Sequence, residues 1–273
     1  MSYQKEIRKH FEDNKEKFFP NIAGGKWRNS EIDYLHILPK NHEELNLLPI
    51  YRDSLNQYLE TNRSCIKRHI YFHHLNSSQA MCLNFFFPLM EEQELDMILK
   101  FIGFEKEEID YDKTCFEKTS DIEKGNYRAT SFDFYIETKS GKKIFFEIKF
   151  TESKFGVAKF NDDHINKFNA VYKGNLGAIE EKYHQPATFC SNYQILRNLI
   201  CISEDSYVVF LYPIKNKKIK TQAEFAKSNI LKNEVKGNLF NLTWEDLLHY
   251  TESNLKSHKL KVHFRNFREK YNL

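Results

Sequence analysis

Residues 131–152, SFDFYIETKSGKKIFFEIKFTE, decide the fold that this sequence predicts. Apolar residues alternate with polar residues in both halves of the stretch, and a period of two is typical of β-strands with one apolar face. Lys139, Ser140 and Gly141 lie between the halves and suit a three-residue hairpin loop. Such a loop ends in a left-handed residue, where glycine has no steric penalty. The stretch is therefore predicted to be a β-hairpin.

The loop also sets the register of the hairpin. It pairs Thr138 with Lys142 and, counting back along the strands, Asp133 with Glu147. Directly paired residues project to the same face with Cβ atoms roughly 5 Å apart, and Lys149 shares that face because it follows Glu147 by two positions. A loop one residue longer or shorter would place Asp133 on the opposite face unless a bulge corrected it.

This trio of charged residues suits metal-dependent chemistry. Two neighbouring carboxylates do not both stay ionised cheaply without a cation or a proton between them. Glycosidases and aspartic proteases use such pairs but need no lysine beside them, whereas Mg²⁺ is typically held by one or two carboxylates plus substrate phosphates. Asp133 and Glu147 are the predicted ligands, the carbonyl of Ile148 is a third, and Lys149 would orient and help deprotonate water or neutralise charge at phosphorus. The hairpin thus predicts phosphodiester hydrolysis with Mg²⁺, or with Mn²⁺ as a substitute, unless its charges merely face solvent.

The length of the chain allows more than one domain organisation, and its net charge says little about its partners. We expect the 273 residues to form a helical extension over residues 1–70 and one domain over residues 71–273. The net charge of +3 says little, but lysines gather near the start of the C-terminal third, at Lys215, Lys217, Lys218 and Lys220. That asymmetry permits a polyanion on one face, although an ordinary solvated surface also explains it.

Cysteine usage and hydropathy predict a reducing compartment. The five cysteines are odd in number and widely spaced, so we expect free thiols, most of them buried, rather than disulfides or a zinc site. The N-terminus lacks the apolar core of a signal peptide, and no apolar run is long enough to span a bilayer. We therefore expect a cytoplasmic protein without a membrane partner.

The rest of the chain is predicted to be mostly helical. Expected helices cover residues 3–18, 50–61, 78–88 and 93–101, a long helix beginning at Pro186, a helix after Thr243 and a basic helix ending at Tyr271. Strands are expected over residues 109–118 and 207–212, and a basic connection containing a helix over residues 217–236. The middle of the chain thus follows the order helix, three strands, helix, strand.

Two further segments contain polar residues of interest. The expected loop NIAGGKWRNS, residues 21–30, contains Lys26, Trp27 and Arg28, where the tryptophan could stack on a base or fill a surface groove. The expected helix over residues 78–88 is apolar over most of its circumference, so Gln79 and Asn84 need polar partners. Each could be functional or simply a satisfied core amide.

The order of elements and the residues Asp133, Glu147 and Lys149 resemble the PD-(D/E)XK nuclease superfamily. More narrowly, the segments LNSSQAMCLNFFFPL, TSFDFYIE, IFFEIKFTESKFG, YQILRN and FLYP are similar to segments of bacterial restriction endonucleases of that superfamily. The resemblance covers roughly residues 70–250. It implies an α/β fold with a restriction-endonuclease-like core, in which helices flank a central mixed β-sheet in the order αβββαβ.

The resemblance also implies roles for individual residues. Asp133 takes the first acidic position, Glu147 the second and Lys149 that of the lysine, while Phe132 replaces the proline before the aspartate. Gln194 resembles a glutamine that many such enzymes place near the metal.

Other positions depart from the family pattern. The tyrosine that follows the glutamine by four positions in the exonuclease branch is Asn198 here, which weakens an exonuclease assignment. Gln79 lies on the helix from which other members project a glutamate, and Glu152 is expected at the rim of the site.

The implied function is that of a metal-dependent endonuclease acting on double-stranded DNA, for restriction or defence against foreign DNA. Substrate contacts are expected from Lys26, Trp27, Arg28, Lys217 and Lys218, and a homodimer would allow both strands to be cut. Two alternatives stay open, because a fold does not fix a substrate. They are a repair or RNA-processing nuclease on the same fold, and a nucleic-acid-binding or regulatory module with a vestigial site.

Overall fold

The computed structural model describes residues 2–123 and 129–273 and divides into two compact units. One unit consists of Met1–Glu105 together with Trp244–Leu273, and the other of Lys106–Thr243. The expected boundary between an extension over residues 1–70 and a nuclease-like domain stays a prediction.

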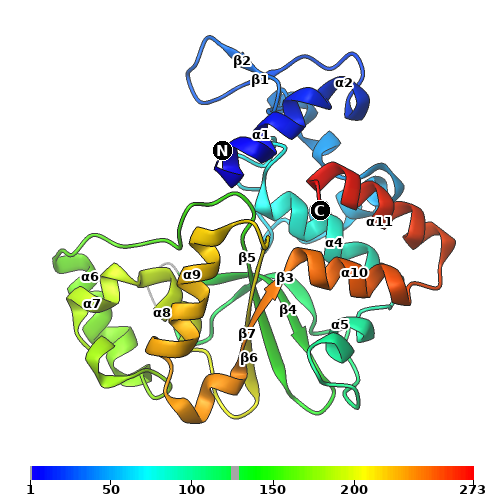
Figure 1. Ribbon diagram of the computed structural model, residues 1–273. Helices are drawn as coiled ribbons and strands as arrows, with labels where there is room; N and C mark the ends of the chain where they lie inside the picture. The colour runs from blue at the N-terminus through cyan, green and yellow to red at the C-terminus, as the bar shows by residue number, and fades with distance from the viewer. Residues whose placement is uncertain (1, 124–128) are drawn as a thin grey trace. The chain divides into compact units, whose positions relative to one another are not determined.

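The unit Lys106–Thr243 is built around a five-stranded sheet with the order β3-β4-β5-β6-β7 (Figure 1). Its strands are β3 (Cys115–Thr119), β4 (Ser131–Glu137), β5 (Lys143–Ile148), β6 (Ser206–Tyr212) and β7 (Leu239–Thr243). The pairs β3–β4 and β4–β5 are antiparallel, whereas β5–β6 and β6–β7 are parallel. The predicted class, a mixed α/β fold with a central mixed sheet, is confirmed, and β7 is a strand that the sequence did not predict.

The hairpin formed by β4 and β5 has the predicted register. Glu137 pairs with Lys143 and Phe134 with Phe146. The N–H of Gly141 donates to the carbonyl of Thr138 at 2.9 Å, and Gly141 has a φ of 94°, in the left-handed region that favours glycine. One step beyond Phe134 and Phe146, this register places Asp133 opposite Glu147.

The central strand β5 differs from the prediction because both of its faces are buried. Every residue from Ile144 to Ile148 is buried. Ile144, Phe146 and Ile148 form the predicted apolar face, and the opposite face, with Phe145 and Glu147, is buried as well. Glu147 therefore lies on a mixed face that is covered and does not face solvent.

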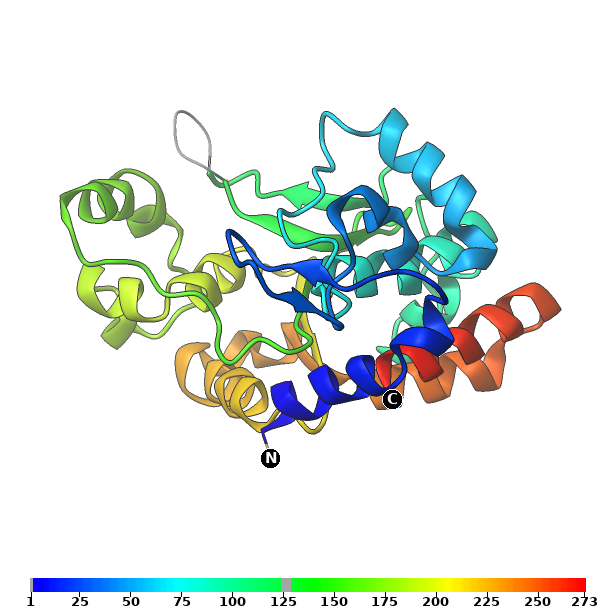
Figure 2. The same ribbon diagram turned by 90° about the horizontal axis from the view of Figure 1, so that it is seen from above.

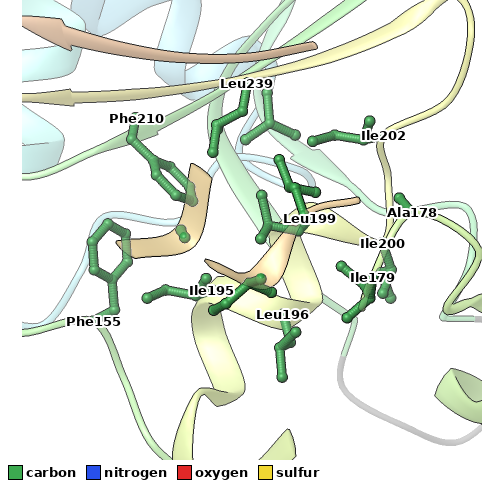
Figure 3. Close-up of a cluster of buried hydrophobic side chains, with 14 of the residues drawn as sticks. Phe155, Ala178, Ile179, Ile195, Leu196, Leu199, Ile200, Ile202, Phe210 and Leu239 are labelled. Carbon is green, nitrogen blue, oxygen red and sulfur yellow. The ribbon is translucent and has the colours of Figure 1, made fainter. Parts of the chain in front are cut away.

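The helices that follow β5 complete an apolar core on one face of the sheet. Figure 3 shows Ile195, Leu196 and Leu199 packed in a cluster with Phe210 of β6 and Leu239 of β7. The α-helices of this unit are α6 (Asp162–Lys167), α7 (Pro186–Ser191), α8 (Tyr193–Leu199) and α9 (Lys217–Phe225). Shorter helical turns are η3 (Phe168–Tyr172), η4 (Lys173–Asn175), η5 (Glu181–Tyr183), η6 (Ala226–Ile230) and η7 (Asn233–Asn238).

The long helix predicted from Pro186 is divided in two. The backbone of Asn192, with φ −120° and ψ 29°, leaves the helical region and separates α7 from α8. The predicted strand over residues 109–118 was also misplaced, because β3 begins only at Cys115.

The other unit is mainly helical. Its elements are α1 (Tyr3–Asp13), α2 (Lys15–Phe18), β1 (Gly25–Lys26), β2 (Asp33–Tyr34), η1 (Lys40–Asn46), η2 (Pro49–Tyr51), α3 (Arg52–Thr61), α4 (Ser78–Glu91), α5 (Asp96–Phe101), α10 (Trp244–Asn254) and α11 (His258–Tyr271). Helices α10 and α11 lie side by side (Figure 2). In the core of this unit the ring of Phe85 contacts the rings of Trp244, Phe264 and Phe267.

Several local predictions for this unit can be compared with the structure. Ser77 caps α4 by accepting a hydrogen bond from the N–H of Ala80, so the helix begins at Ser78 as expected, but it continues past Pro88 to Glu91. The loop expected over residues 21–30 contains β1, which pairs with β2.

The structure agrees in part with the predictions for the cysteines and for membrane-spanning segments. All five cysteines are free; Cys82 and Cys190 are buried, whereas Cys65 is exposed. Within the described parts of the chain, none of the helices combines the length and the apolar character that crossing a membrane requires.

Candidate functional site

Asp133, Glu147 and Lys149 gather where the β4–β5 hairpin meets the segment after β5. The Nζ atom of Lys149 lies 2.7 Å from Oε1 of Glu147, and the two side chains are only 8% and 5% exposed. Oδ2 of Asp133 accepts a hydrogen bond from the N–H of Ile148 at 2.6 Å. The structure thus brings these predicted residues together, and their catalytic roles stay predictions.

The charges at this site favour a cation. Burial and the carboxylates of Glu147 and Glu117 raise the pKa of Asp133 well above its ordinary value, although Lys149 and the N–H of Ile148 oppose them. Burial alone would lower the pKa of Lys149, but the carboxylates of Glu147, Glu152 and Asp133 outweigh it and raise the pKa. Burial is thus the main cause of the shift at Asp133, and the neighbouring carboxylates add to it, whereas at Lys149 the carboxylates overcome burial.

Two amide side chains from α8 hold the carboxylate of Glu147. Nε2 of Gln194 donates to Oε1 at 2.7 Å, and Nδ2 of Asn198 donates to Oε2 at 3.0 Å. The two amides lie four positions apart, which places them on the same face of a helix. Gln194 was expected near this site. Asn198 was noted in the sequence only as a departure from the exonuclease pattern, and no local signal could have revealed its contact with Glu147.

Gln194 also connects Glu147 to Lys149. Its Oε1 accepts hydrogen bonds from Nζ of Lys149 at 3.2 Å and from the N–H of Gly156 at 2.8 Å. The N–H of Gln194 donates in turn to the carbonyl of Gly156 at 2.9 Å. A Cβ atom at Gly156 would lie 3.4 Å from Oε1 of Gln194. Gln194 is therefore held closely on one side by backbone, and its amide fixes the acid and the lysine relative to each other.

The contacts of Glu147 leave room for a metal ion. Oε1 accepts hydrogen bonds from Lys149 and Gln194, whereas Oε2 accepts only from Asn198 among the described residues. Each carboxylate oxygen has two lone pairs, so Oε2 keeps one of them for a cation. No group of three or more His, Cys, Asp and Glu residues is arranged as a metal site in the described parts of the chain. Metal binding here stays a prediction: the carboxylates of Asp133 and Glu147 are oxygen donors of the kind that Mg²⁺ takes, and the carbonyl of Ile148 stays the predicted third donor.

A third acidic residue, Glu117, lies beside the pair. Phe116 pairs with Phe134 and Lys118 with Phe132, which places Glu117 opposite Asp133 on the neighbouring strand. Glu117 has a φ of 54°, and its Oε2 accepts a hydrogen bond from Oγ of Ser131 at 2.8 Å. The sequence did not single out Glu117, because apolar and polar residues alternate only imperfectly in the segment IDYDKTCFEK, residues 109–118.

Glu152 lies on the segment that leaves the site. Its Oε2 accepts a hydrogen bond from the N–H of Phe150 at 2.6 Å. Asn216 ties the same segment down, because its Nδ2 donates to the carbonyl oxygens of Phe150 and Glu152 at 3.0 and 2.9 Å. Glu152 is thus close to Lys149, whose pKa it raises.

The first turn of α9 is attached to this segment through Asn216. Oδ1 of Asn216 caps the helix by accepting a hydrogen bond from the N–H of Ile219. Lys217 and Lys218 follow directly and are exposed. The structure therefore places these two predicted substrate contacts near the segment that follows Lys149.

Gln79 belongs to the other unit, and its amide is used locally. Its Oε1 accepts a hydrogen bond from the N–H of His69 at 2.8 Å, and its Nε2 donates to the carbonyl of Lys67 at 3.0 Å. These contacts attach the segment before α4 to the first turn of that helix. A catalytic role for Gln79 stays a prediction.

Lys26, Trp27 and Arg28 lie at the β1–β2 hairpin of that same unit. Trp27 is 46% exposed, and the guanidinium of Arg28 lies 5.4 Å from the centre of its ring. Nε of Arg28 donates to the hydroxyl of Tyr71 at 2.8 Å. Much of the Trp27 side chain is thus accessible to a partner, and the expected contact with nucleic acid stays a prediction.

Comparison with known proteins gives one result. A family model described as "Restriction Endonuclease associating with ARP" matches residues 8–272, which include the β4–β5 hairpin and α8. No curated protein and no solved structure matches the chain.

Proposed function

The chain belongs to this family of restriction endonucleases, and we propose that it is a metal-dependent endonuclease of the PD-(D/E)XK type that cleaves double-stranded DNA. Restriction or defence against foreign DNA is the role that fits such an activity. One observation carries the finer proposal: the carboxylate of Glu147 on β5 lies 2.7 Å from the buried ammonium of Lys149, one residue past the end of that strand, and the partner strand β4 presents a second carboxylate.

Asp133 and Glu147 would hold Mg²⁺, or Mn²⁺ as a substitute, together with the carbonyl of Ile148. The bound ion would supply Lewis-acid chemistry at the scissile phosphate. Gln194 and Asn198 keep the Glu147 carboxylate in one orientation, so it need not reorganise when substrate arrives.

Lys149 is the residue proposed to act on the attacking water and on the phosphate. Its ammonium is held by Glu147 and Gln194, and it would orient the water and offset the negative charge that develops at phosphorus. The water oxygen would then bond to phosphorus as the bond from phosphorus to the leaving oxygen breaks, with the proton of the water released to solvent and the leaving oxygen protonated from solvent.

The surface around α9 supports contact with a nucleic-acid backbone. Lys217 and Lys218 are exposed, and Asn216 connects them to the segment after Lys149. Lysines of this kind bind phosphates and position a duplex without reading its sequence. We propose Lys26, Trp27 and Arg28 as a second contact, and a homodimer as the form that cuts both strands.

Cleavage of supercoiled plasmid DNA tests the proposal. The protein should nick or linearise the plasmid with Mg²⁺ or Mn²⁺ and leave it intact with EDTA. Asp133→Ala, Glu147→Ala and Lys149→Ala should each abolish cleavage while circular dichroism and the melting temperature show a folded protein. Lys143→Ala changes an exposed lysine at the far end of the same strand and should cleave like the wild type. Full activity of Lys149→Ala would contradict the mechanism.

The same assay separates the alternatives. Preferential cleavage of RNA, or of damaged duplexes, would support a processing or repair nuclease. Metal-independent DNA binding without any cleavage would support a vestigial site in a binding module.

A further inference from the structure

The unit that contains α1 and α11 has a pocket that the proposed nuclease chemistry does not use. Its volume is about 550 Å³, which suits a small organic molecule. Its lining comes from α2 and the segment after it, from the stretch between the end of η1 and the start of α3, and from the end of α11. Most of that lining is apolar and includes Phe18, Pro20, Ile22, Leu45, Leu48 and Pro49.

Arg52 brings a cation without a close counter-charge to this pocket. Its Nε donates to the carbonyl of Leu47 at 3.0 Å. In the described parts of the chain, no carboxylate forms an ion pair with the guanidinium, and no hydrogen bond uses its terminal NH₂ groups. Glu44 and Asp53 act on it only at longer range, and burial lowers the pKa of Arg52 despite them.

Lys270 is a second such cation in the lining. It is 3% exposed, and Asn46 accepts its hydrogen bonds through the backbone carbonyl and through Oδ1, the latter at 2.8 Å. The ammonium also lies 5.1 Å from the centre of the Tyr271 ring, but of its three N–H donors the two contacts with Asn46 use only two. Burial, followed by the positive charge of Arg52, lowers the pKa of Lys270 well below its ordinary value. The two cations are thus close enough to repel each other.

The acidic residue in the lining does not neutralise these two cations. Glu269 forms an ion pair with Lys17, on the side of α2. Arg52 and Lys270 therefore stand at an apolar cavity without an ion pair to either of them among the described residues. A partly buried cation lacks the solvation that water would give it, and an anionic group is its natural replacement.

We propose that this pocket binds a small amphiphilic anion, with a carboxylate or phosphate head on Arg52 and Lys270 and an apolar body against Phe18, Leu45 and Leu48. The apolar lining excludes a simple inorganic ion as the preferred occupant, because an ion would leave that surface unused. The two cations exclude a neutral hydrocarbon, because it would leave their positive charge without a partner. This inference is independent of the nuclease site, which lies in the other unit.

Isothermal titration calorimetry on the full chain, without DNA or added metal, tests the proposal with octanoate, octyl phosphate, 1-octanol and acetate. Octanoate or octyl phosphate should bind at one saturable site, and the tighter of the two identifies the preferred head group. 1-Octanol, which lacks the charge, and acetate, which lacks the chain, should bind at least tenfold more weakly.

Variants at Arg52 connect the binding to the pocket. Arg52→Gln should weaken the better ligand at least tenfold, or about 1.4 kcal/mol, and Arg52→Lys should restore much of the affinity. Arg63→Gln, which removes an exposed arginine just after α3, should bind like the wild type. Leu48→Trp should block binding by filling the cavity. Thermal melting reports whether each variant is folded.

Three outcomes would overturn the proposal: no saturable binding of either anion, equal binding of 1-octanol, or unchanged affinity in a folded Arg52→Gln. Plasmid cleavage does not depend on ligand binding in this pocket, so a failure of the pocket proposal is distinguishable from a failure of the nuclease proposal.

Discussion

Asn198 donates a hydrogen bond to Oε2 of Glu147 across 3.0 Å from a position that is fully buried. Its other amide atom, Oδ1, is buried without a hydrogen-bond partner among the described residues. Leaving a polar atom unsatisfied costs free energy, so the chain retains this asparagine at the expense of stability. The site uses the Nδ2 group of Asn198, because this group holds Oε2 of Glu147, the carboxylate oxygen that keeps a free lone pair.

We therefore expect Asn198→Ala to lower the rate of DNA cleavage about tenfold, since a hydrogen bond to a charged group contributes about 1.5 kcal/mol or more. The Mg²⁺ concentration needed for half-maximal cleavage should rise at the same time. A purely structural role would lower the folded fraction without moving that Mg²⁺ dependence. Asn229→Ala, at an exposed position on η6, is the control, and an unchanged rate and Mg²⁺ dependence in Asn198→Ala would refute the prediction.

The close approach between Gly156 and Gln194 gives a second prediction. Even a Cβ atom at Gly156 would already lie in contact with Oε1 of Gln194, at 3.4 Å, so the branched side chain of Gly156→Val should displace the amide. Because small displacements at the proposed catalytic site are costly, we expect cleavage to fall about threefold to tenfold with little change in melting temperature. Gly174→Val is the matched control, because nothing lies within 4 Å of a Cβ atom there.

Lys217 and Lys218 are expected to contribute affinity without sequence preference. Changing both to alanine should weaken binding to every duplex alike and reduce the slope of log K against log salt by about 2. The double variant Lys173→Ala and Lys182→Ala removes the same charge from other exposed positions and should keep the wild-type slope. Electrophoretic mobility shifts at several salt concentrations provide the measurement. Equal slopes in the two double variants would exclude a phosphate contact at α9.

Glu123 gives a prediction about acid stability. Its carboxylate accepts a hydrogen bond from the hydroxyl of Tyr172 at 2.5 Å and forms ion pairs with Lys167 at 2.9 Å and Arg197 at 2.7 Å. Burial alone would raise the pKa of Glu123, but these contacts and the N–H of Thr130 lower it to about 2. The unfolded chain, with a glutamate pKa of about 4.3, therefore binds this proton first as the pH falls.

The contribution of Glu123 to stability should be complete above about pH 5 and lost as the pH falls to about 2, a change of about 3 kcal/mol. Urea unfolding between neutral and acidic pH should show this loss in the wild type and a flatter dependence in Glu123→Gln. Glu108→Gln, which removes an exposed carboxylate that pairs with Lys139, should retain the wild-type dependence. Parallel curves for the wild type and Glu123→Gln would contradict the prediction.

The sequence predicted what depends on near neighbours. The turn at Gly141 and the alternation on either side of it determine the register of β4 and β5, because a hairpin is a local structure. The contact between Asn198 and Glu147 joins residues 51 positions apart, and no local pattern carries that information. Strand β7 was missed for a similar reason. Its place in the sheet depends on pairing with the buried strand β6, and its short sequence alone does not predict a strand.

The division of the chain into units was equally hard to predict. Trp244–Leu273 groups with the N-terminal residues, through contacts such as that between Phe85 and Trp244. Only tertiary packing specifies such a grouping. The break at Asn192 is another such case, because the apolar pattern from Pro186 continues through it.

The change from antiparallel to parallel pairing at β5 has a consequence for the order of folding. The pairs between β4 and β5 close a short loop, whereas the pairs between β5 and β6, such as Lys143 with Ser206, close one that contains all of α6–α8. Short loops close at a smaller entropic cost and more quickly. We expect Asp133 and Glu147 to approach each other early, and the amides of α8 to reach them only when the long loop has closed. In a newly synthesised chain the two acids would therefore meet before the amides fix their orientation, and the proposed nuclease activity would appear only after the long loop has closed.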